Sequence, residues 1–213
     1  MKVKICGITN KEDAVWAINY GADYLGLNFY SNSPRHVTVP TASKWVPQLP
    51  TFASIVGVFV DAEVEEIVKA VTKLKLKGIQ LHGDESVDFV ARLKSDLEAA
   101  GHSPFIMKAF RTGSESVLPA VEPYKDVVDF VLLDSKSPDL HGGTGERFDW
   151  DKALEVKGLG KQLFLAGGLT SENVKLAIKK VQPFGVDVAS GVEKSHRKKD
   201  GDKMRDFITC AKG

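Results

Sequence analysis

The sequence has few cysteines and no long apolar run, and these absences exclude several classes of protein. Its 213 residues include only two cysteines, Cys6 and Cys210, which are an unlikely disulfide framework. No stretch approaches the roughly 20 apolar residues that a membrane-spanning helix needs, and the N-terminal apolar run is too short for a signal sequence. We therefore expect a soluble, cytoplasmic protein with no membrane partner.

The sequence also lacks an excess of one charge sign. It has 29 Lys and Arg residues against 28 Asp and Glu residues, a formal net charge of +1. This balance gives no whole-molecule attraction to polyanions, so we expect no nucleic-acid partner. The one basic run, EKSHRKKD at 193–200, favours a solvated surface segment, with support of an anion site as the alternative. No linker or low-complexity segment interrupts the chain, and we expect one domain over residues 1–213.

Apolar runs rich in β-branched residues recur along the chain, with amphipathic helical patterns between them. Thr9 and Glu12 have the spacing of a capping box, which predicts that the first helix begins there. The segment 112–123 is the weakest helix because two prolines shorten it. Eight strand–helix units predict an α/β fold, a single (β/α)8 barrel, with a doubly wound open sheet as the runner-up. The predicted strands are residues 3–6, 24–29, 54–60, 78–81, 105–110, 129–134, 162–166 and 185–189.

Polar residues stand where several predicted strands end, which is where both architectures bind ligands. Cys6 ends the first run and is either a small buried hydrophobe or a reactive thiol. Asp134 ends the sixth run and is either a loop-capping carboxylate or a catalytic one. Arg35 follows the second run, where its planar fork suits a carboxylate but also suits solvent. His82 follows the fourth run and lacks the neighbouring ligands that a metal site requires.

Glycine turns follow the last two predicted strands. Gly167 and Gly168 come directly after the seventh run, and Ser190 and Gly191 directly after the eighth. Backbone N–H groups in such turns can approach an anion, and the loops after strands seven and eight of a barrel form its recurrent phosphate site. The alternative is that these glycines only make tight turns. A third cluster, HGGTGERFDW at 141–150, lacks the lysine of a Walker motif and does not match the dinucleotide fingerprint.

These blocks together resemble one family. The segments KICGIT, SPR, GVFV, IQLHG, LLDS, GGTGERFDW, LAGGLTSENV and GVDVASGVE are similar, in this order, to those of the phosphoribosylanthranilate isomerases of tryptophan biosynthesis. The match covers essentially the whole chain. The sequence departs from the family at Ala189, where serine is frequent, and at His196 and Arg197, where a proline–glycine pair is common.

The resemblance implies an Amadori rearrangement of N-(5-phosphoribosyl)anthranilate, with no redox cofactor and no metal. It implies Asp134 as general acid and Cys6 as general base, with Arg35 on the anthranilate carboxylate. His82 and Asp187 are expected near the substrate, and the glycine turns at Gly167, Gly168, Ser190 and Gly191 on its phosphate. The base must be available as thiolate, so we expect the site to lower the pKa of Cys6, or the cationic Schiff base to promote its ionisation.

The partner implied is this small phosphosugar–anthranilate substrate, bound by a monomer or homodimer. Other phosphosugar barrels fit less well. A histidine-pathway isomerase is expected to carry aspartate in place of Cys6, and an indole-glycerol-phosphate synthase needs a lysine and glutamate constellation that is not found. A barrel that binds such a ligand without turning it over is a further alternative, which a turnover assay would separate.

Overall fold

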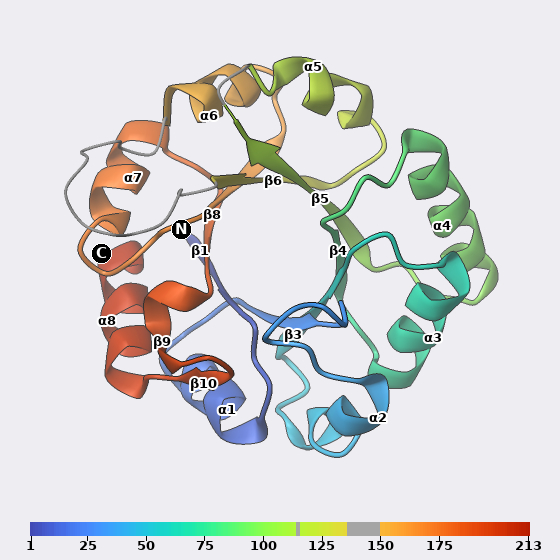
Figure 1. Ribbon diagram of the computed structural model, residues 1–213, viewed down its shortest axis with the longest axis horizontal. Helices are drawn as coiled ribbons and strands as arrows, with labels where there is room; N and C mark the ends of the chain where they lie inside the picture. Colours follow the sequence, from blue (N-terminus) through green and yellow to red (C-terminus); the bar gives the residue numbers. More distant parts are fainter. Residues whose placement is uncertain (114–115, 136–149) are drawn as a thin grey trace.

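A computed structural model describes residues 1–113, 116–135 and 150–213 of the chain. Parallel strands β1 to β8 form a closed barrel in sequence order, and β8 pairs with β1 to close it (Figure 1). The predicted (β/α)8 barrel is confirmed. The strands are β1 Lys2–Cys6, β2 Tyr24–Asn28, β3 Ser54–Phe59, β4 Gly78–Leu81, β5 Phe105–Thr112, β6 Phe130–Ser135, β7 Gln162–Ala166 and β8 Gly185–Val188.

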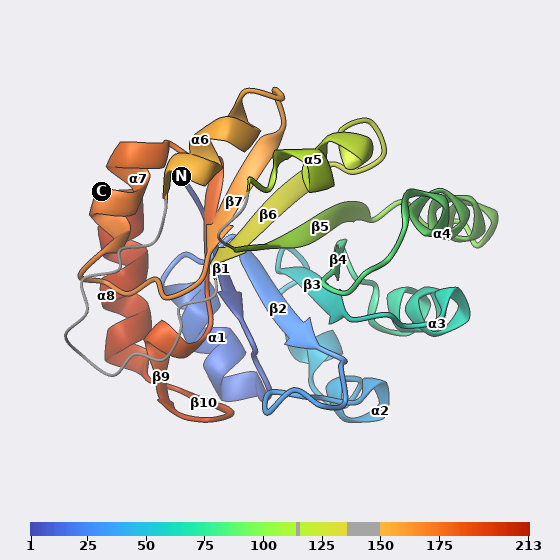
Figure 2. The same ribbon diagram turned by 45° about the horizontal axis from the view of Figure 1, so that its top comes forward.

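Helices surround the barrel as an outer ring (Figures 1 and 2). The helix between β2 and β3 is a short one followed by a 3-10 turn, and the helix after β5 has only four residues, as the prolines predict. The helices are α1 Lys11–Asn19, α2 Val39–Ala42, α3 Val64–Leu74, α4 Val87–Ala99, α5 Leu118–Val121, α6 Trp150–Lys157, α7 Val174–Val181 and α8 Gly201–Lys212; the 3-10 turns are η1 Val46–Gln48, η2 Glu122–Tyr124 and η3 Ser190–Val192.

The first helix does not begin as predicted. Asn10 is its N-cap and accepts a hydrogen bond from the backbone N–H of Asp13 at 2.9 Å. The Thr9 hydroxyl instead donates to the backbone carbonyl of Arg197, near the end of the chain. The capping box of Thr9 and Glu12 is therefore wrong by one residue, because asparagine is at least as good a cap as threonine and Thr9 has a tertiary partner.

Strand residues alternate between two environments. Val3 and Ile5 on β1 are fully buried in the apolar layer between barrel and helices, whereas Lys4 pairs inside the barrel with Asp187 on β8. The N-terminal end of the barrel is filled by aromatic rings, which pack edge-to-face or stacked against one another: Tyr24, Phe105, Phe130, Phe164 and Phe184. This end is filled, so the cavity lies at the opposite end, where the strands finish.

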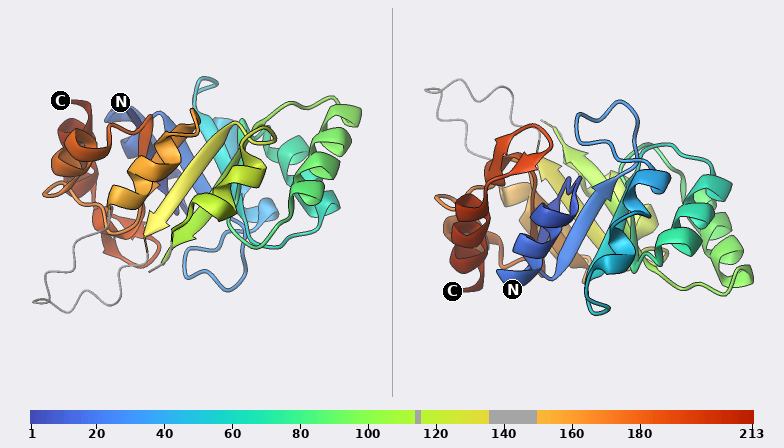
Figure 3. Two further views of the ribbon diagram at one scale, coloured as in Figure 1. Left: turned by 90° about the horizontal axis from the view of Figure 1, so that it is seen from above. Right: turned by 90° about the horizontal axis from the view of Figure 1, so that it is seen from below.

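The chain adds a small hairpin after η3. Strands β9 Glu193–Ser195 and β10 Lys198–Lys199 pair antiparallel and lead into α8. Figure 3 shows this hairpin beside the end of the barrel at which β1 and β2 finish. The interpretation of residues 193–200 as a solvated run is wrong for Glu193 and Lys199, which are both buried.

Candidate active site

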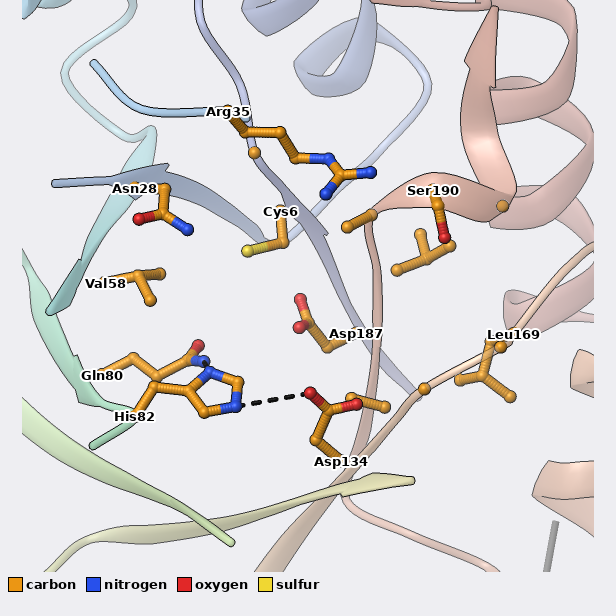
Figure 4. A pocket seen from close by; sticks show the side chains of 17 residues that line it. Cys6, Asn28, Arg35, Val58, Gln80, His82, Asp134, Leu169, Asp187 and Ser190 are labelled. Atoms are coloured by element: carbon orange, nitrogen blue, oxygen red, sulfur yellow. Dashed lines mark hydrogen bonds and ion pairs between the residues drawn. The ribbon is translucent and has the colours of Figure 1, made fainter. Parts of the chain in front are cut away.

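A cavity of about 490 Å³ lies at the C-terminal ends of the strands (Figure 4). Each residue that the sequence singled out as catalytic, substrate-binding or phosphate-binding lines it: Cys6, Arg35, His82, Asp134, Gly167, Gly168, Asp187, Ser190 and Gly191. The closed barrel explains this convergence, because its parallel strands all end on one rim. The motif at 141–150 lies, apart from Trp150, outside the described residues.

Asp134 is connected to His82 across the pocket. The Nε2 atom of His82 lies 3.3 Å from Oδ2 of Asp134, and the Asp134 side chain is one-third exposed (Figure 4). His82 Nδ1 lies 3.0 Å from the Gln80 side-chain nitrogen, so its ring is fixed on both sides. The Oε1 atom of Gln80 is buried and has no partner among the described residues. These contacts hold the Asp134 carboxyl at the pocket wall opposite Cys6.

Cys6 ends β1, and Figure 4 shows its sulfur pointing into the pocket. Burial raises the pKa of the Cys6 thiol above its ordinary value; the nearby Lys4 and Lys199 oppose this effect, and Asp187 adds to it. The expectation that the protein alone lowers the pKa of this thiol is therefore wrong. The physical reason is desolvation, which disfavours the thiolate in the barrel interior.

Arg35 already holds a carboxylate of the protein. Its Nε and Nη2 atoms each donate to Glu193 on β9 at 2.6 Å, a two-point ion pair. Lys199 on β10 also contacts Glu193, at 3.2 Å, and donates to the carbonyl of Ala189 at 2.9 Å. Burial by itself would raise the pKa of the Glu193 carboxyl. The contacts with Arg35 and Lys199 outweigh this effect, so the pKa of Glu193 lies below its ordinary value.

The two glycine turns lie in contact. Gly167 and Gly168 have φ values of +87° and +62°, a conformation that glycine adopts at little cost. A Cβ on Gly191 would lie 2.0 Å from the carbonyl oxygen of Leu169, so the turns after β7 and β8 touch and only glycine fits between them. The two turns are therefore close enough together to contact one anion, as the prediction of a common anion site requires.

The sequence did not predict four buried polar residues in or near the pocket, of which Gln80 lines it. Lys4 and Gln80 are fully interior positions of strands that otherwise look apolar, and both are buried. Glu193 and Lys199 appear in the sequence as members of a charged surface run. One signal for Lys4 was available, because a charged residue in the middle of an apolar strand needs a buried partner.

Among the described residues, no cluster of three or more His, Cys, Asp or Glu side chains is arranged to hold a metal ion. In the described part of the chain, no helix is both long and apolar enough to cross a membrane.

The fold and the pocket define a (β/α)8-barrel protein with acid, thiol and arginine groups on a cavity that two glycine turns also line. A family model described as N-(5'-phosphoribosyl)anthranilate isomerase matches residues 3–210. The protein of that name from Geobacter sp. (strain M21) is 44% identical over 211 residues, which cover 99% of this chain and 98% of the relative. The chain belongs to the N-(5'-phosphoribosyl)anthranilate isomerase family.

Solved structures of the same family resemble this fold closely. The phosphoribosyl anthranilate isomerase of Thermotoga maritima superposes with a TM-score of 0.89 at 38% identity, covering 100% of this chain and 99% of that one. A further such enzyme, solved in complex with reduced 1-(o-carboxyphenylamino)-1-deoxyribulose 5-phosphate, gives a TM-score of 0.87 at 36% identity, with 100% and 99% covered. The resemblance is confirmed: the chain is an isomerase of tryptophan biosynthesis, and its reaction is the Amadori rearrangement of N-(5'-phosphoribosyl)anthranilate.

Proposed function

We propose that Asp134 and Cys6 are the general acid and general base of this rearrangement. The observation that carries the proposal is their position on one cavity, at the ends of β6 and β1, with the touching glycine turns of β7 and β8 on the same rim. The reaction needs a proton delivered to the ring oxygen and another removed from the sugar C2, so it needs two groups that reach different atoms.

In the first step Asp134 gives its proton to the furanose ring oxygen as the C1–O bond breaks, and the nitrogen lone pair forms the C1=N⁺ bond of a Schiff base. In the second step the Cys6 thiolate takes the C2 proton, the C2–H pair forms C1=C2, and the C=N π pair returns to nitrogen. The resulting enolamine tautomerises to the ketone. The cationic Schiff base favours a thiolate beside it, which offsets the desolvation of Cys6.

The other pocket residues hold the substrate in this geometry. Backbone N–H groups of Gly167, Gly168, Ser190 and Gly191 bind its phosphate. Arg35 binds the anthranilate carboxylate, and His82 positions Asp134 through the 3.3 Å contact. We infer that the partner is the small phosphosugar–anthranilate substrate. The assembly is a monomer or a homodimer, and sedimentation would distinguish the two.

The test replaces the two proton-transfer groups. We expect Cys6→Ser and Asp134→Asn each to lower turnover by about 10²- to 10⁴-fold with the fold intact, because serine is a far weaker acid than a thiol and asparagine has no acidic proton. The measurement is steady-state turnover across pH, with circular dichroism as the folding control. The wild-type kcat/KM profile should be bell-shaped, and its alkaline limb should disappear in Asp134→Asn. A folded Cys6→Ser variant with a near-native rate would remove Cys6 from the chemistry.

A further inference from the structure

Lys4 is a fully buried cation directly beneath the pocket. It lies on β1 two residues before Cys6, and none of its side chain is exposed. Its Nζ atom is 2.9 Å from Oδ1 of Asp187, the residue opposite Lys4 in the pairing of β1 with β8. A buried ammonium is costly, and one carboxylate oxygen satisfies only one of its three N–H donors. The proposed mechanism assigns Lys4 no task.

The Lys4 ammonium and the Cys6 thiol occupy the same small space. Gly26 on β2 lies opposite Cys6 in the β1–β2 pairing, and it has no side chain to fill the barrel interior there. A Cβ on Gly26 would lie 2.8 Å from the Cys6 sulfur and 3.1 Å from Nζ of Lys4. Both groups therefore lie next to the space that a side chain at position 26 would occupy. A buried N–H donor of Lys4 lies beside the Cys6 sulfur.

The groups around the Cys6 sulfur have opposing effects on the pKa of its thiol. Burial and Asp187 raise the pKa of the Cys6 thiol, whereas Lys4 lowers it, with a smaller contribution from Lys199. Burial lowers the pKa of Lys4, but the Asp187 carboxylate and the Cys6 thiolate outweigh this effect, so Lys4 stays protonated at neutral pH. The charged groups that face the sulfur are Lys4 from β1, Asp187 from β8, Lys199 from β10 and Arg35 from the loop after β2.

We propose that Lys4 is a positioning residue that donates a hydrogen bond to the Cys6 thiolate and holds it charged and oriented for removal of the C2 proton. The proposal rests on the proposed role of Cys6 as base. Lys4 itself transfers no proton: the thiolate becomes a thiol when the C2–H bond breaks, and the thiol returns its proton to solvent after the product leaves. Asp187 on β8 holds the Lys4 ammonium in place, so that the ammonium lies between the Asp187 carboxylate and the Cys6 sulfur.

The test measures the thiol directly, because alkylation by iodoacetamide requires the thiolate. All variants carry Cys210→Ser, which leaves Cys6 as the single thiol. We expect Lys4→Met to slow alkylation at pH 8 by about tenfold or more, since an adjacent opposite charge changes a pKa by about one unit or more. It should also lower kcat with little change in KM. Lys2→Met is the matched control, on the same strand but exposed and paired with Asp23, and should change neither quantity.

A second comparison removes the risk that Lys4→Met fails to fold with Asp187 unpaired. The variant Lys4→Met/Asp187→Asn contains neither charge and is compared with Asp187→Asn alone. We expect the double variant to alkylate more slowly. Equal alkylation rates in these two folded variants would mean that Lys4 only neutralises Asp187, and would overturn the proposal. Slower alkylation together with an active Cys6→Ser variant would leave the Lys4 contact standing and refute Cys6 as base, so the two failures are distinguishable.

Discussion

Arg35 shows how far residue type alone predicts a binding role. Its position after β2 and its two-point geometry predicted a carboxylate partner, and the structure supplies one from within the chain, Glu193. Among the described residues, its Nη1 atom has no hydrogen-bond partner. Glu193 thus fixes one edge of the fork, and we expect the substrate carboxylate to use the remaining donors. The sequence could not predict this pair, because 158 residues separate its members.

Replacing Arg35 tests this role. We expect Arg35→Ala to weaken binding of reduced 1-(o-carboxyphenylamino)-1-deoxyribulose 5-phosphate by roughly ten- to hundredfold, since a charge-assisted contact contributes about 1.5–3 kcal/mol. Titration calorimetry measures the Kd. Arg92→Ala is the control, because Arg92 is exposed and contacts Glu65, and neither residue lines the pocket. Unchanged affinity in Arg35→Ala would assign the anthranilate carboxylate to another group.

At the scale of elements, the strands were predictable and the helix ends were not. Each predicted strand lies within two residues of the observed one at either end, because long β-branched runs buried on both faces have few alternatives. Two adjacent polar residues, Thr9 and Asn10, could each cap the start of α1. Thr9 instead donates to the distant carbonyl of Arg197, and Asn10 is the cap. The β9–β10 hairpin was missed because its strands are short and charged.

The cap of α1 can be checked by two matched substitutions. We expect Asn10→Ala to lower the free energy of unfolding by about 1 kcal/mol, since it removes the acceptor for the Asp13 N–H. Thr9→Ala removes an exposed hydrogen bond to Arg197 and should cost less. Urea unfolding followed by circular dichroism measures both. If Thr9→Ala proved the more destabilising change, the capping box would be restored as the start of this helix.

At the scale of the whole molecule, the barrel is filled at one end and open at the other. The aromatic rings at the strand starts leave no room for a side chain at Gly185 on β8, where a Cβ would lie 2.4 Å from the Phe164 ring. The sequence predicted a barrel and its rim but not this filling. Which residues face inward follows from strand register around a closed ring, and single-strand patterns do not contain that information.

Overfilling this end should destabilise the protein. We expect Gly185→Ala to lower the free energy of unfolding by about 1–3 kcal/mol, because the buried Phe164 ring would have to move. Gly113→Ala is the control: its Cβ would meet no atom of the described residues within 4 Å, and its φ is not in the left-handed region. Thermal unfolding of both variants provides the measurement. Equal stabilities would show that the ring layer is loosely packed.

The two ends of the described chain meet at Asp23, in the loop before β2. Its carboxylate accepts from Nζ of Lys2 at 2.9 Å and from the Val3 backbone N–H at 2.9 Å, and it pairs with Nζ of Lys212 on α8 at 2.8 Å. Burial alone would raise the pKa of Asp23, but the two lysines and the Val3 N–H outweigh it, so the pKa lies below its ordinary value. A depressed carboxyl pKa stabilises the fold above the unfolded pKa, about 3.9, and this contribution is lost as the pH falls through the folded pKa.

We therefore expect Asp23→Asn to lower the free energy of unfolding by about 1 kcal/mol at pH 7, and by less near pH 2, because the lysine pairs are lost as the pH falls through the folded pKa of Asp23. Asp129→Asn is a close control. Asp129 stands before β6 as Asp23 stands before β2, and it accepts from the Ile106 N–H at 2.7 Å, with no lysine ion pair among the described residues. Its effect should depend less on pH. Urea unfolding of wild type and the two variants at both pH values measures these effects. If Asp23→Asn lost the same free energy of unfolding at pH 7 and at pH 2, the lysine pairs would contribute nothing to stability. Only the backbone hydrogen bond, which Asp129 also makes, would then matter.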